Sequence, residues 1–196
     1  MTYDALRTDG DQPKIAFTFH GTGASASQLH GLAQEFLPGH HVVSPEGDVD
    51  ENGAARFFRR TGEGVYDMDD LARAVDKMAG FIEAEVTRTG ASRVIGLGYS
   101  NGANILAAVM LKQPALVTEA VLMHPLIPWD PEPQPGLSGA RLLVTAGEAD
   151  PICPAPRTRA LLDYLSAQGA QVTDLWHPGG HEIRQEEVQA VQGFLR

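Results

Sequence analysis

The sequence has 196 residues, of which 43% are hydrophobic and 20% are charged, and its formal net charge is −10. This composition is typical of a globular chain, and the negative charge argues against nucleic acid or an anionic membrane as a partner. The chain has no run of 18 apolar residues and no basic and apolar N-terminal segment, so we expect neither a membrane helix nor a signal peptide. The single cysteine, Cys153, excludes an internal disulfide. We therefore expect a cytoplasmic protein with one domain spanning residues 1–196.

Short apolar runs that are typical of strands alternate with stretches of helical periodicity along the chain. The predicted strands are residues 14–19, 41–44, 93–97, 120–123, 141–146 and 171–176. The predicted helices lie at about residues 29–37, 67–90, from 105 onward, 157–168 and 184–195. The alternation predicts a compact α/β fold with a mostly parallel central sheet flanked by helices. No insertion is long enough for a large cap domain.

Residues that can begin or end a helix stand beside two of the predicted helices. Ser25 or Ser27 could cap the first helix with a side-chain oxygen. Asp67 is expected to open the long amphipathic helix that Gly90 closes.

The stretch Gly98-Tyr99-Ser100-Asn101-Gly102 joins a predicted buried strand to a predicted buried helix. A Gly-x-Ser-x-Gly motif in this context is typical of a nucleophile elbow, a sharp turn that exposes a serine hydroxyl. The glycines let the strand and the helix approach closely, because a β-carbon at either flank would clash. The helix N-terminus also offers free N–H groups and partial positive charge that can stabilise an oxyanion. Ser100 is therefore a candidate nucleophile, and the alternative is a glycine-rich turn with an incidental serine.

A serine nucleophile needs a histidine base and an acid that orients it. In the α/β-hydrolase order the acid and then the histidine follow the serine, which leaves His177 and His181 as candidate bases. The histidines that this order excludes as bases are His20, His30, His40, His41 and His124. We prefer His181, because two glycines precede it in a loop that can reach over the sheet. His177 directly ends a predicted strand and precedes a proline.

The preferred acid is Asp150, which follows the predicted strand at residues 141–146 and lies on its loop side. Glu148, two residues earlier, is the competitor. Asp130 in a proline-rich loop and Asp163 inside a predicted helix fit less well. The alternative role of Asp150 is an Asx-turn before the following proline.

An oxyanion hole needs two backbone N–H donors. The first candidate is the N–H of Asn101, and the second is that of Thr22 in the loop His20-Gly21-Thr22-Gly23, which is otherwise a tight turn. We expect His20 to fix this loop by hydrogen bonding. The loop lacks the third glycine of a dinucleotide fingerprint and the lysine of a P-loop, and the histidines lack metal-ligand spacing, so we expect no cofactor and no metal.

An aromatic and basic cluster lies in the turn-rich segment at residues 46–66, with the sequence Arg56-Phe57-Phe58-Arg59-Arg60. Either phenylalanine could line an acyl or aryl pocket, while an arginine such as Arg59 selects a carboxylate or phenolate. Alternatively, the phenylalanines anchor the segment to the core and the arginines pair with acids such as Glu63 and Asp67. Trp129 is either a pocket wall or a cover over the core.

Seven stretches together resemble the phospholipase/carboxylesterase family of small α/β-hydrolases, which includes the acyl-protein thioesterases. The stretches are residues 19–23, 44–47, 56–60, 96–104, 124–125, 147–151 and 177–181. They look most like the bacterial branch of hydroquinone-specific, or phenolic-ester, esterases. The resemblance implies a catalytic triad of Ser100, Asp150 and His181, with the amides of Thr22 and Asn101 as the oxyanion hole.

The resemblance implies a serine carboxylesterase that hydrolyses small carboxylic esters, including aryl or phenolic esters, through an acyl-enzyme. An acyl-thioesterase or lysophospholipase-like hydrolase with the same triad is the alternative, and a catalytically silent binding protein is a third. The acyl-protein thioesterases carry glutamine after the serine and Gly-Asp in the first loop, where this chain has Asn101 and Gly23-Ala24. This difference argues against lipidated protein as the substrate. Family members are often dimers, which leaves a homodimer open, although no apolar helix face demands a partner.

Overall fold

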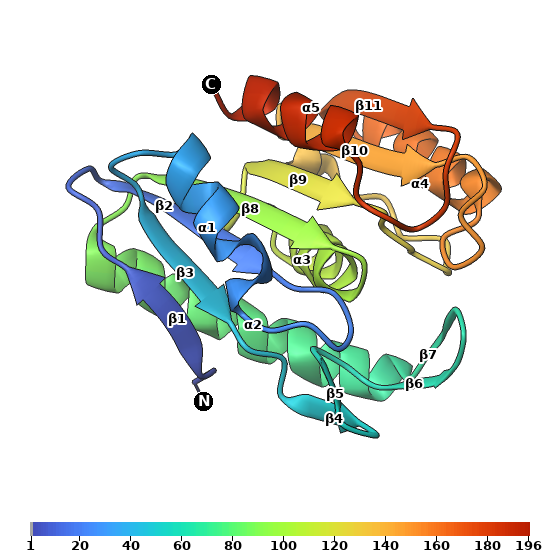
Figure 1. The fold of residues 1–196 in the computed structure, drawn as a ribbon, viewed down its shortest axis with the longest axis horizontal. Helices are drawn as coiled ribbons and strands as arrows, with labels where there is room; N and C mark the ends of the chain where they lie inside the picture. The colour runs from blue at the N-terminus through green and yellow to red at the C-terminus, as the bar shows by residue number, and fades with distance from the viewer. Residues whose placement is uncertain (1) are drawn as a thin grey trace.

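The computed structural model describes residues 2–196. A seven-stranded sheet in this part of the chain has the order β1-β3-β2-β8-β9-β10-β11 (Figure 1). Its strands are β1 (Ala5–Thr8), β2 (Lys14–Phe19), β3 (His41–Pro45), β8 (Arg93–Tyr99), β9 (Glu119–Met123), β10 (Arg141–Gly147) and β11 (Gln171–His177). β1 pairs antiparallel with β3, and the other neighbouring strands pair parallel. The predicted α/β fold with a mostly parallel sheet is therefore confirmed.

The edge strand β1 is the one strand of this sheet that the sequence does not indicate. Its residues show no apolar alternation, and Leu6 remains 43% exposed. The strand is held by pairing with a distant segment, in which Leu6 lies opposite Ser44. Beyond the strand, the backbone N–H of Glu46 donates to the carbonyl oxygen of Asp4 at 2.8 Å. Side-chain contacts also hold β1, since Arg7 pairs with Glu85 of α2 at 2.7 Å. Local periodicity cannot reveal a strand whose support comes from such distant contacts.

Helices cover both faces of the sheet. The helices within residues 2–196 are α1 (Ser27–Phe36), α2 (Met68–Thr89), α3 (Asn101–Lys112), α4 (Ala155–Ala167) and α5 (Gln185–Leu195), with a 3-10 turn, η1 (Pro135–Leu137). In Figure 1, α1 and α5 lie in front of the sheet, and α2, α3 and α4 lie behind it. Successive residues of β2 serve the two faces, since Phe17 and Phe19 pack in the core behind the sheet and Ala16 packs in the core in front. Burial of one such phenylalanine contributes about 1.5–3 kcal/mol.

The two predicted helix starts have different outcomes. The side chain of Asp67 caps α2 by accepting a hydrogen bond from the N–H of Asp70 at 3.1 Å, and Gly90 ends α2 with a φ of 65°, as predicted. The prediction for α1 is wrong, because its N-cap is Ala26 and neither neighbouring serine caps the helix. Instead the carboxylate of Glu46 accepts from the N–H of Ala26 at 2.7 Å, where the positive end of the helix dipole stabilises it.

The segment at residues 46–66 forms two small hairpins. These pair β4 (Val49–Glu51) with β5 (Ala54–Arg56), and β6 (Arg60–Gly62) with β7 (Val65–Tyr66). They lie on the side toward which the parallel strands point (Figure 1). Between the hairpins, Phe57 and Phe58 are fully buried and anchor the segment to the core. No helix within residues 2–196 combines the length and the apolarity needed to cross a membrane.

Candidate active site

Ser100 occupies the apex of a strained turn between β8 and α3. Its φ of 53° and ψ of −119° lie where side-chain-bearing residues are rare. A β-carbon on Gly98 would lie 2.6 Å from the carbonyl oxygen of Gly102, and one on Gly102 would overlap the carbonyl of Phe19 in β2. The backbone N–H of Ser100 donates to the carbonyl of Met123 at 2.9 Å and ties the turn to β9. The predicted strand-turn-helix geometry, and the need for its glycines, are confirmed.

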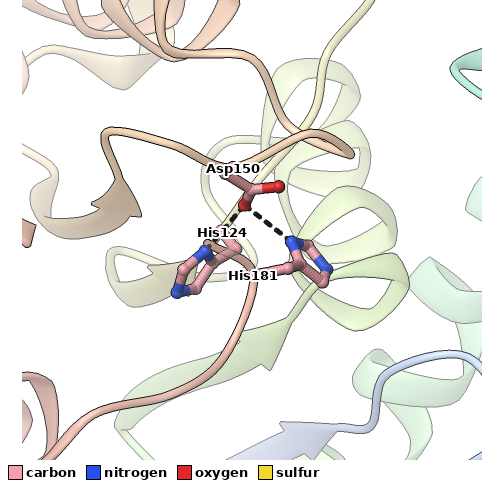
Figure 2. Close-up of side chains that lie close together, drawn as sticks. All are labelled: His124, Asp150 and His181. Atoms are coloured by element: carbon pink, nitrogen blue, oxygen red, sulfur yellow. Dashed lines mark hydrogen bonds and ion pairs between the residues drawn. The ribbon is translucent and has the colours of Figure 1, made fainter. Parts of the chain in front are cut away.

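Ser100, His181 and Asp150 form one line of hydrogen bonds. The Oγ of Ser100 lies 2.8 Å from Nε2 of His181. Nδ1 of His181 lies 2.7 Å from Oδ2 of Asp150, the contact that Figure 2 shows. The three side chains come from the carboxyl ends of β8, β10 and β11, which meet at one edge of the sheet. The structure therefore brings together the three side chains that the sequence selects. The competing acids Glu148, Asp130 and Asp163 are exposed on the surface.

The carboxylate of Asp150 accepts four hydrogen bonds. Its Oδ1 accepts from the N–H groups of Ile152 at 2.8 Å and Cys153 at 2.9 Å, and its Oδ2 faces His181 at 2.7 Å and His124 at 2.9 Å. Burial favours a raised pKa of Asp150, but the hydrogen bonds from His124, His181 and Cys153 outweigh it and hold the pKa well below the usual range. The Asx-turn and the contact with His181 thus use different oxygens of one ionised side chain.

The two predicted oxyanion donors lie in the same pocket as Ser100. Asn101 is the first residue of α3, so its N–H has no acceptor one turn earlier in the helix. The loop that carries Thr22 is fixed by Arg56, whose Nη1 donates to the Thr22 hydroxyl at 2.7 Å. The buried ring of His20 fixes the loop through both of its nitrogens. Nδ1 lies 2.7 Å from the carbonyl of Gly21, and Nε2 accepts from the N–H of Gly47 at 2.9 Å. His20 is thus a structural hydrogen-bonding residue, as expected.

The pocket at Ser100 has a volume of about 280 Å³. Its walls combine the side chains of Tyr66, Leu126 and Ile152 with those of Arg56, Arg60 and Glu63. Arg60 pairs with Glu63 at 2.9 Å and with Glu51 at 2.8 Å, and Arg56 lies 3.7 Å from Glu51. Burial lowers the pKa of Arg56, but an arginine this basic remains charged.

The four residues proposed from the sequence as substrate contacts do not line this pocket. Phe57 and Phe58 are fully buried, where Phe57 packs on His20 and Phe58 packs edge-on against Tyr66. Arg59 is exposed, and Trp129 lines two other surface hollows. The pocket-wall interpretation of these residues is therefore corrected, and the anchoring interpretation describes the phenylalanines. The arginines that do line the pocket, Arg56 and Arg60, flank the buried pair.

The sequence did not predict the contact between Asp150 and His124. His124 follows β9 directly with a φ of 52°, and its ring is fully buried between Asp150 and Glu187. These partners lie 26 and 63 residues further along the chain, so no local spacing reveals them. The sequence singles out His124 only by its place at the end of a buried strand and by its membership of the family-like stretch at residues 124–125, and neither gives its partners.

Within residues 2–196, two groups of side chains have donor atoms close enough to one another to suit a metal ion. They are His124, Asp150 and His181, and His124, His177 and Glu187, with donor atoms within 4.8 Å of one another in each group. Most of these atoms already face one another at hydrogen-bond distance, and Asp150 accepts four hydrogen bonds. These atoms are therefore arranged for hydrogen bonds to one another. The absence of a metal remains a prediction.

Comparison with known proteins identifies a close relative over nearly the whole chain. No protein-family model matches the sequence. Over 189 residues the chain is 35% identical to the Bacillus subtilis (strain 168) protein named "Putative hydrolase MhqD". The matched residues cover 95% of this chain and 94% of that protein.

Solved structures of similar fold include two carboxylesterases. The Bacillus cereus carboxylesterase is 30% identical with a TM-score of 0.93, over 98% of this chain and 93% of that chain. The carboxylesterase of Mesorhizobium loti is 30% identical with a TM-score of 0.86, over 95% and 90% of the two chains. Atu2452 of Agrobacterium tumefaciens str. C58, a protein of unknown function, is 53% identical with a TM-score of 0.93, over 98% and 95%. The chain belongs to the phospholipase/carboxylesterase family of α/β-hydrolases.

Proposed function

We propose that this chain is a serine carboxylesterase that hydrolyses small carboxylic esters through an acyl-enzyme, with Ser100, His181 and Asp150 as its catalytic triad. The observation that carries the proposal is the line of hydrogen bonds from Ser100 Oγ through the His181 ring to Asp150 Oδ2, at 2.8 and 2.7 Å. Family membership supports a hydrolase, and two similar structures are those of carboxylesterases.

The protonation states follow from the partners of each atom. An ionised carboxylate can only accept, so Nδ1 of His181 carries the proton that faces Asp150. Nε2 is then the free acceptor that faces the Ser100 hydroxyl. This tautomer is the one that a general base needs.

The reaction proceeds in two halves. Ser100 Oγ attacks the ester carbonyl carbon while His181 Nε2 takes its proton, and the N–H groups of Thr22 and Asn101 stabilise the oxyanion. His181 then gives the proton to the leaving alcohol, which leaves an acyl group on Ser100. Water, deprotonated by His181, attacks this acyl-enzyme and releases the acid, and the proton returns to Ser100. Asp150 orients the ring and stabilises the imidazolium in both halves.

The substrate range follows from the pocket. A volume of about 280 Å³ lies just below the usual range of small-molecule sites, which favours short acyl groups. Tyr66 and Tyr99 contribute aromatic surface beside Ser100 that suits a flat aryl group, so aryl or phenolic esters belong to the proposed range. We therefore expect acetate and butyrate esters to be cleaved faster than long-chain esters.

The test is hydrolysis of p-nitrophenyl esters from C2 to C12 by the wild type and by Ser100→Ala. We expect activity on short esters that falls by about a million-fold in the variant, as in a well-studied triad enzyme. A fluorophosphonate probe should label the wild type and not the variant. Activity that persists in Ser100→Ala contradicts the assigned nucleophile, and faster cleavage of C12 than of C2 contradicts the assigned substrate size. Dialysis against EDTA should leave the activity unchanged.

A further inference from the structure

Asp150 has a second histidine partner that the reaction does not use. Nδ1 of His124 lies 2.9 Å from Oδ2 of Asp150, the same oxygen that His181 contacts at 2.7 Å (Figure 2). The two rings lie on different sides of this oxygen, with their centroids 5.1 Å apart. Unlike His181, the side chain of His124 has no exposed surface. His124 can therefore act on the reaction only through its neighbours.

The other end of the His124 ring meets a second buried acid. Its Nε2 lies 3.1 Å from Oε1 of Glu187, the third residue of α5, whose side chain is fully buried. The same oxygen accepts from the hydroxyl of Thr145 at 2.6 Å, and Oε2 accepts from the N–H of Arg184 at 2.7 Å. Glu187 is thus held by the end of β10 and by the start of its own helix.

The geometry specifies the charge of His124. A neutral imidazole has one N–H, whereas an ionised carboxylate only accepts hydrogen bonds. Both ring nitrogens of His124 face carboxylate oxygens, so both contacts are satisfied when His124 is an imidazolium. Burial favours a lower pKa of His124, but the hydrogen bonds to Asp150 and Glu187 outweigh it and raise the pKa to about 9.

His177 is a third buried histidine that lies close to Glu187, and its hydrogen bonds differ from those of His124. Its Nδ1 accepts from the N–H of Gly179 at 3.1 Å, which leaves the proton on Nε2. This Nε2 lies 3.2 Å from Oε2 of Glu187 without the alignment of a hydrogen bond. Glu187 therefore has one fully aligned cationic partner among these rings, which is His124.

We propose that His124, held as an imidazolium by Glu187, is a positioning residue of the esterase that fixes Asp150 and limits the negative charge behind His181. The inference rests on the proposed function, since it assigns His124 a role through the triad acid. His124 supplies one positive charge between two buried acids, so the group carries a net charge of −1 at rest and becomes neutral when His181 takes the proton. Without the imidazolium, two negative charges would lie behind His181.

This charge balance predicts a pH signature. The positive charge of His124 opposes the addition of a proton to His181. Loss of this charge in a variant should therefore move the acid limb, the fall of kcat/KM at low pH, to higher pH. Other titratable or charged groups near His181 come from several elements. Tyr99 of β8 packs on the His181 ring, and Cys153 lies before α4 in the same pocket. Across the pocket are Tyr66, Arg56, Arg60 and Glu63. Close to His181 in the sequence are His177, Glu182 and Arg184. These groups are the same in the wild type and in the variants below.

The first measurement uses the wild-type protein alone. Histidine rings labelled with ¹⁵N report by NMR whether each ring carries one proton or two. We expect the His124 ring to carry two protons at pH 7 and to lose one near pH 9. A neutral His124 ring at pH 7 overturns the proposal, and this result does not depend on any esterase activity.

The second measurement compares three variants, His124→Gln, Glu187→Gln and the double variant, by the pH dependence of kcat/KM on a short ester. We expect His124→Gln to lower kcat/KM roughly 10- to 100-fold, the equivalent of one lost hydrogen bond to a charged group. The acid limb of the pH profile of His124→Gln, where kcat/KM falls at low pH, should move to higher pH by about one unit. Glu187→Gln removes one negative charge, which moves the acid limb to lower pH while His124 keeps its proton. If His124 also loses its proton, the net charge behind His181 stays at −1 and the limb does not move. A shift to higher pH in Glu187→Gln contradicts the proposal.

The double variant separates function from folding. It removes one positive and one negative charge together, so it leaves no unpaired carboxylate and should be more stable than His124→Gln. Its kcat/KM should remain low, because Asp150 still lacks the imidazolium. Its acid limb should lie close to that of the wild type, because one net negative charge lies behind His181 in both proteins. A folded double variant with wild-type kcat/KM overturns the proposal.

The matched control is His30→Gln. His30 lies on α1 and is also buried, but it does not line the pocket at Ser100. Its ring contacts the hydroxyls of Ser44 at 2.7 Å and Thr8 at 3.0 Å. It should lose stability without any shift of the acid limb. A wild type that is inactive on all esters contradicts the proposed function, whereas an active wild type with unchanged His124 variants contradicts only this inference.

Discussion

The phenol of Tyr99 donates a hydrogen bond of 2.6 Å to the backbone carbonyl of His181. Tyr99 directly precedes the strained Ser100, so one side chain joins the turn of the nucleophile to the loop of the base. Its ring also lies tilted on the His181 ring, with centroids 5.4 Å apart. Burial raises the pKa of Tyr99 to about 12, which keeps the phenol a donor throughout the neutral range. The distance between Ser100 and His181 therefore depends on a contact that involves neither catalytic atom.

Removal of this hydroxyl in Tyr99→Phe should lower kcat about 3- to 10-fold and change KM little, because one neutral hydrogen bond contributes about 1 kcal/mol. The ring that packs on His181 is retained, so the loss reports the loop position and not the pocket surface. Steady-state kinetics on a short p-nitrophenyl ester measures the effect. A variant with unchanged kcat would mean that other contacts of the loop suffice.

The choice between Asp150 and Glu148 as the acid is also open to a direct test. Asp150→Asn should reduce kcat/KM on the order of 10⁴-fold, because an amide no longer selects the His181 tautomer with its free Nε2 toward Ser100. Glu148 is exposed and serves as the matched control. Glu148→Gln should retain nearly full activity, and the reverse ranking of the two variants would reassign the acid.

The sequence predicts those parts of the site that depend on local geometry. The elbow around Ser100 follows from glycine spacing between a strand and a helix, and chain order then selects Asp150 and His181. The pair His124 and Glu187 lies beyond this reasoning, because its contact joins the end of a strand to a helix 63 residues later.

The aromatic and basic cluster is a second case where sequence reasoning stops. Composition alone cannot decide which of its side chains enter the core and which face the pocket. That assignment depends on the two hairpins, which place Arg56 and Arg60 at the pocket and bury Phe57 and Phe58. The short strands of these hairpins have three residues or fewer, too few for a periodic pattern.

Two glycines provide opposite predictions for stability. Gly102→Ala should destabilise the fold by more than about 2 kcal/mol, because the added β-carbon would overlap the backbone of Phe19. Gly80 lies inside α2 with open space around an added β-carbon, so Gly80→Ala should stabilise by about 0.5–1 kcal/mol. Chemical denaturation measures both changes. Equal effects of the two substitutions would contradict the close approach of α3 to β2.

The buried ion group predicts how stability changes with pH. The pKa of His124 is raised to about 9 in the folded chain, against about 6.5 in an unfolded one, so its contribution is fully present below pH 6.5 and is lost as the pH rises through 9. A shift of this size corresponds to up to about 3 kcal/mol. Asp150 and Glu187 have lowered pKa values, so their contribution is present at neutral pH and is lost as the pH falls below about 4.

The free energy of unfolding of the wild type should therefore fall between pH 6.5 and 9 more steeply than that of the double variant His124→Gln with Glu187→Gln. Urea denaturation at pH 6.5, 7.5, 8.5 and 9.5 measures the two curves, and their difference isolates this group from other titrations. The difference should be largest at pH 6.5 and small at pH 9.5, because His124 has by then lost its proton in the wild type. Parallel curves over this range would mean that His124 is not charged in the folded chain, and that its two acids are held by neutral hydrogen bonds.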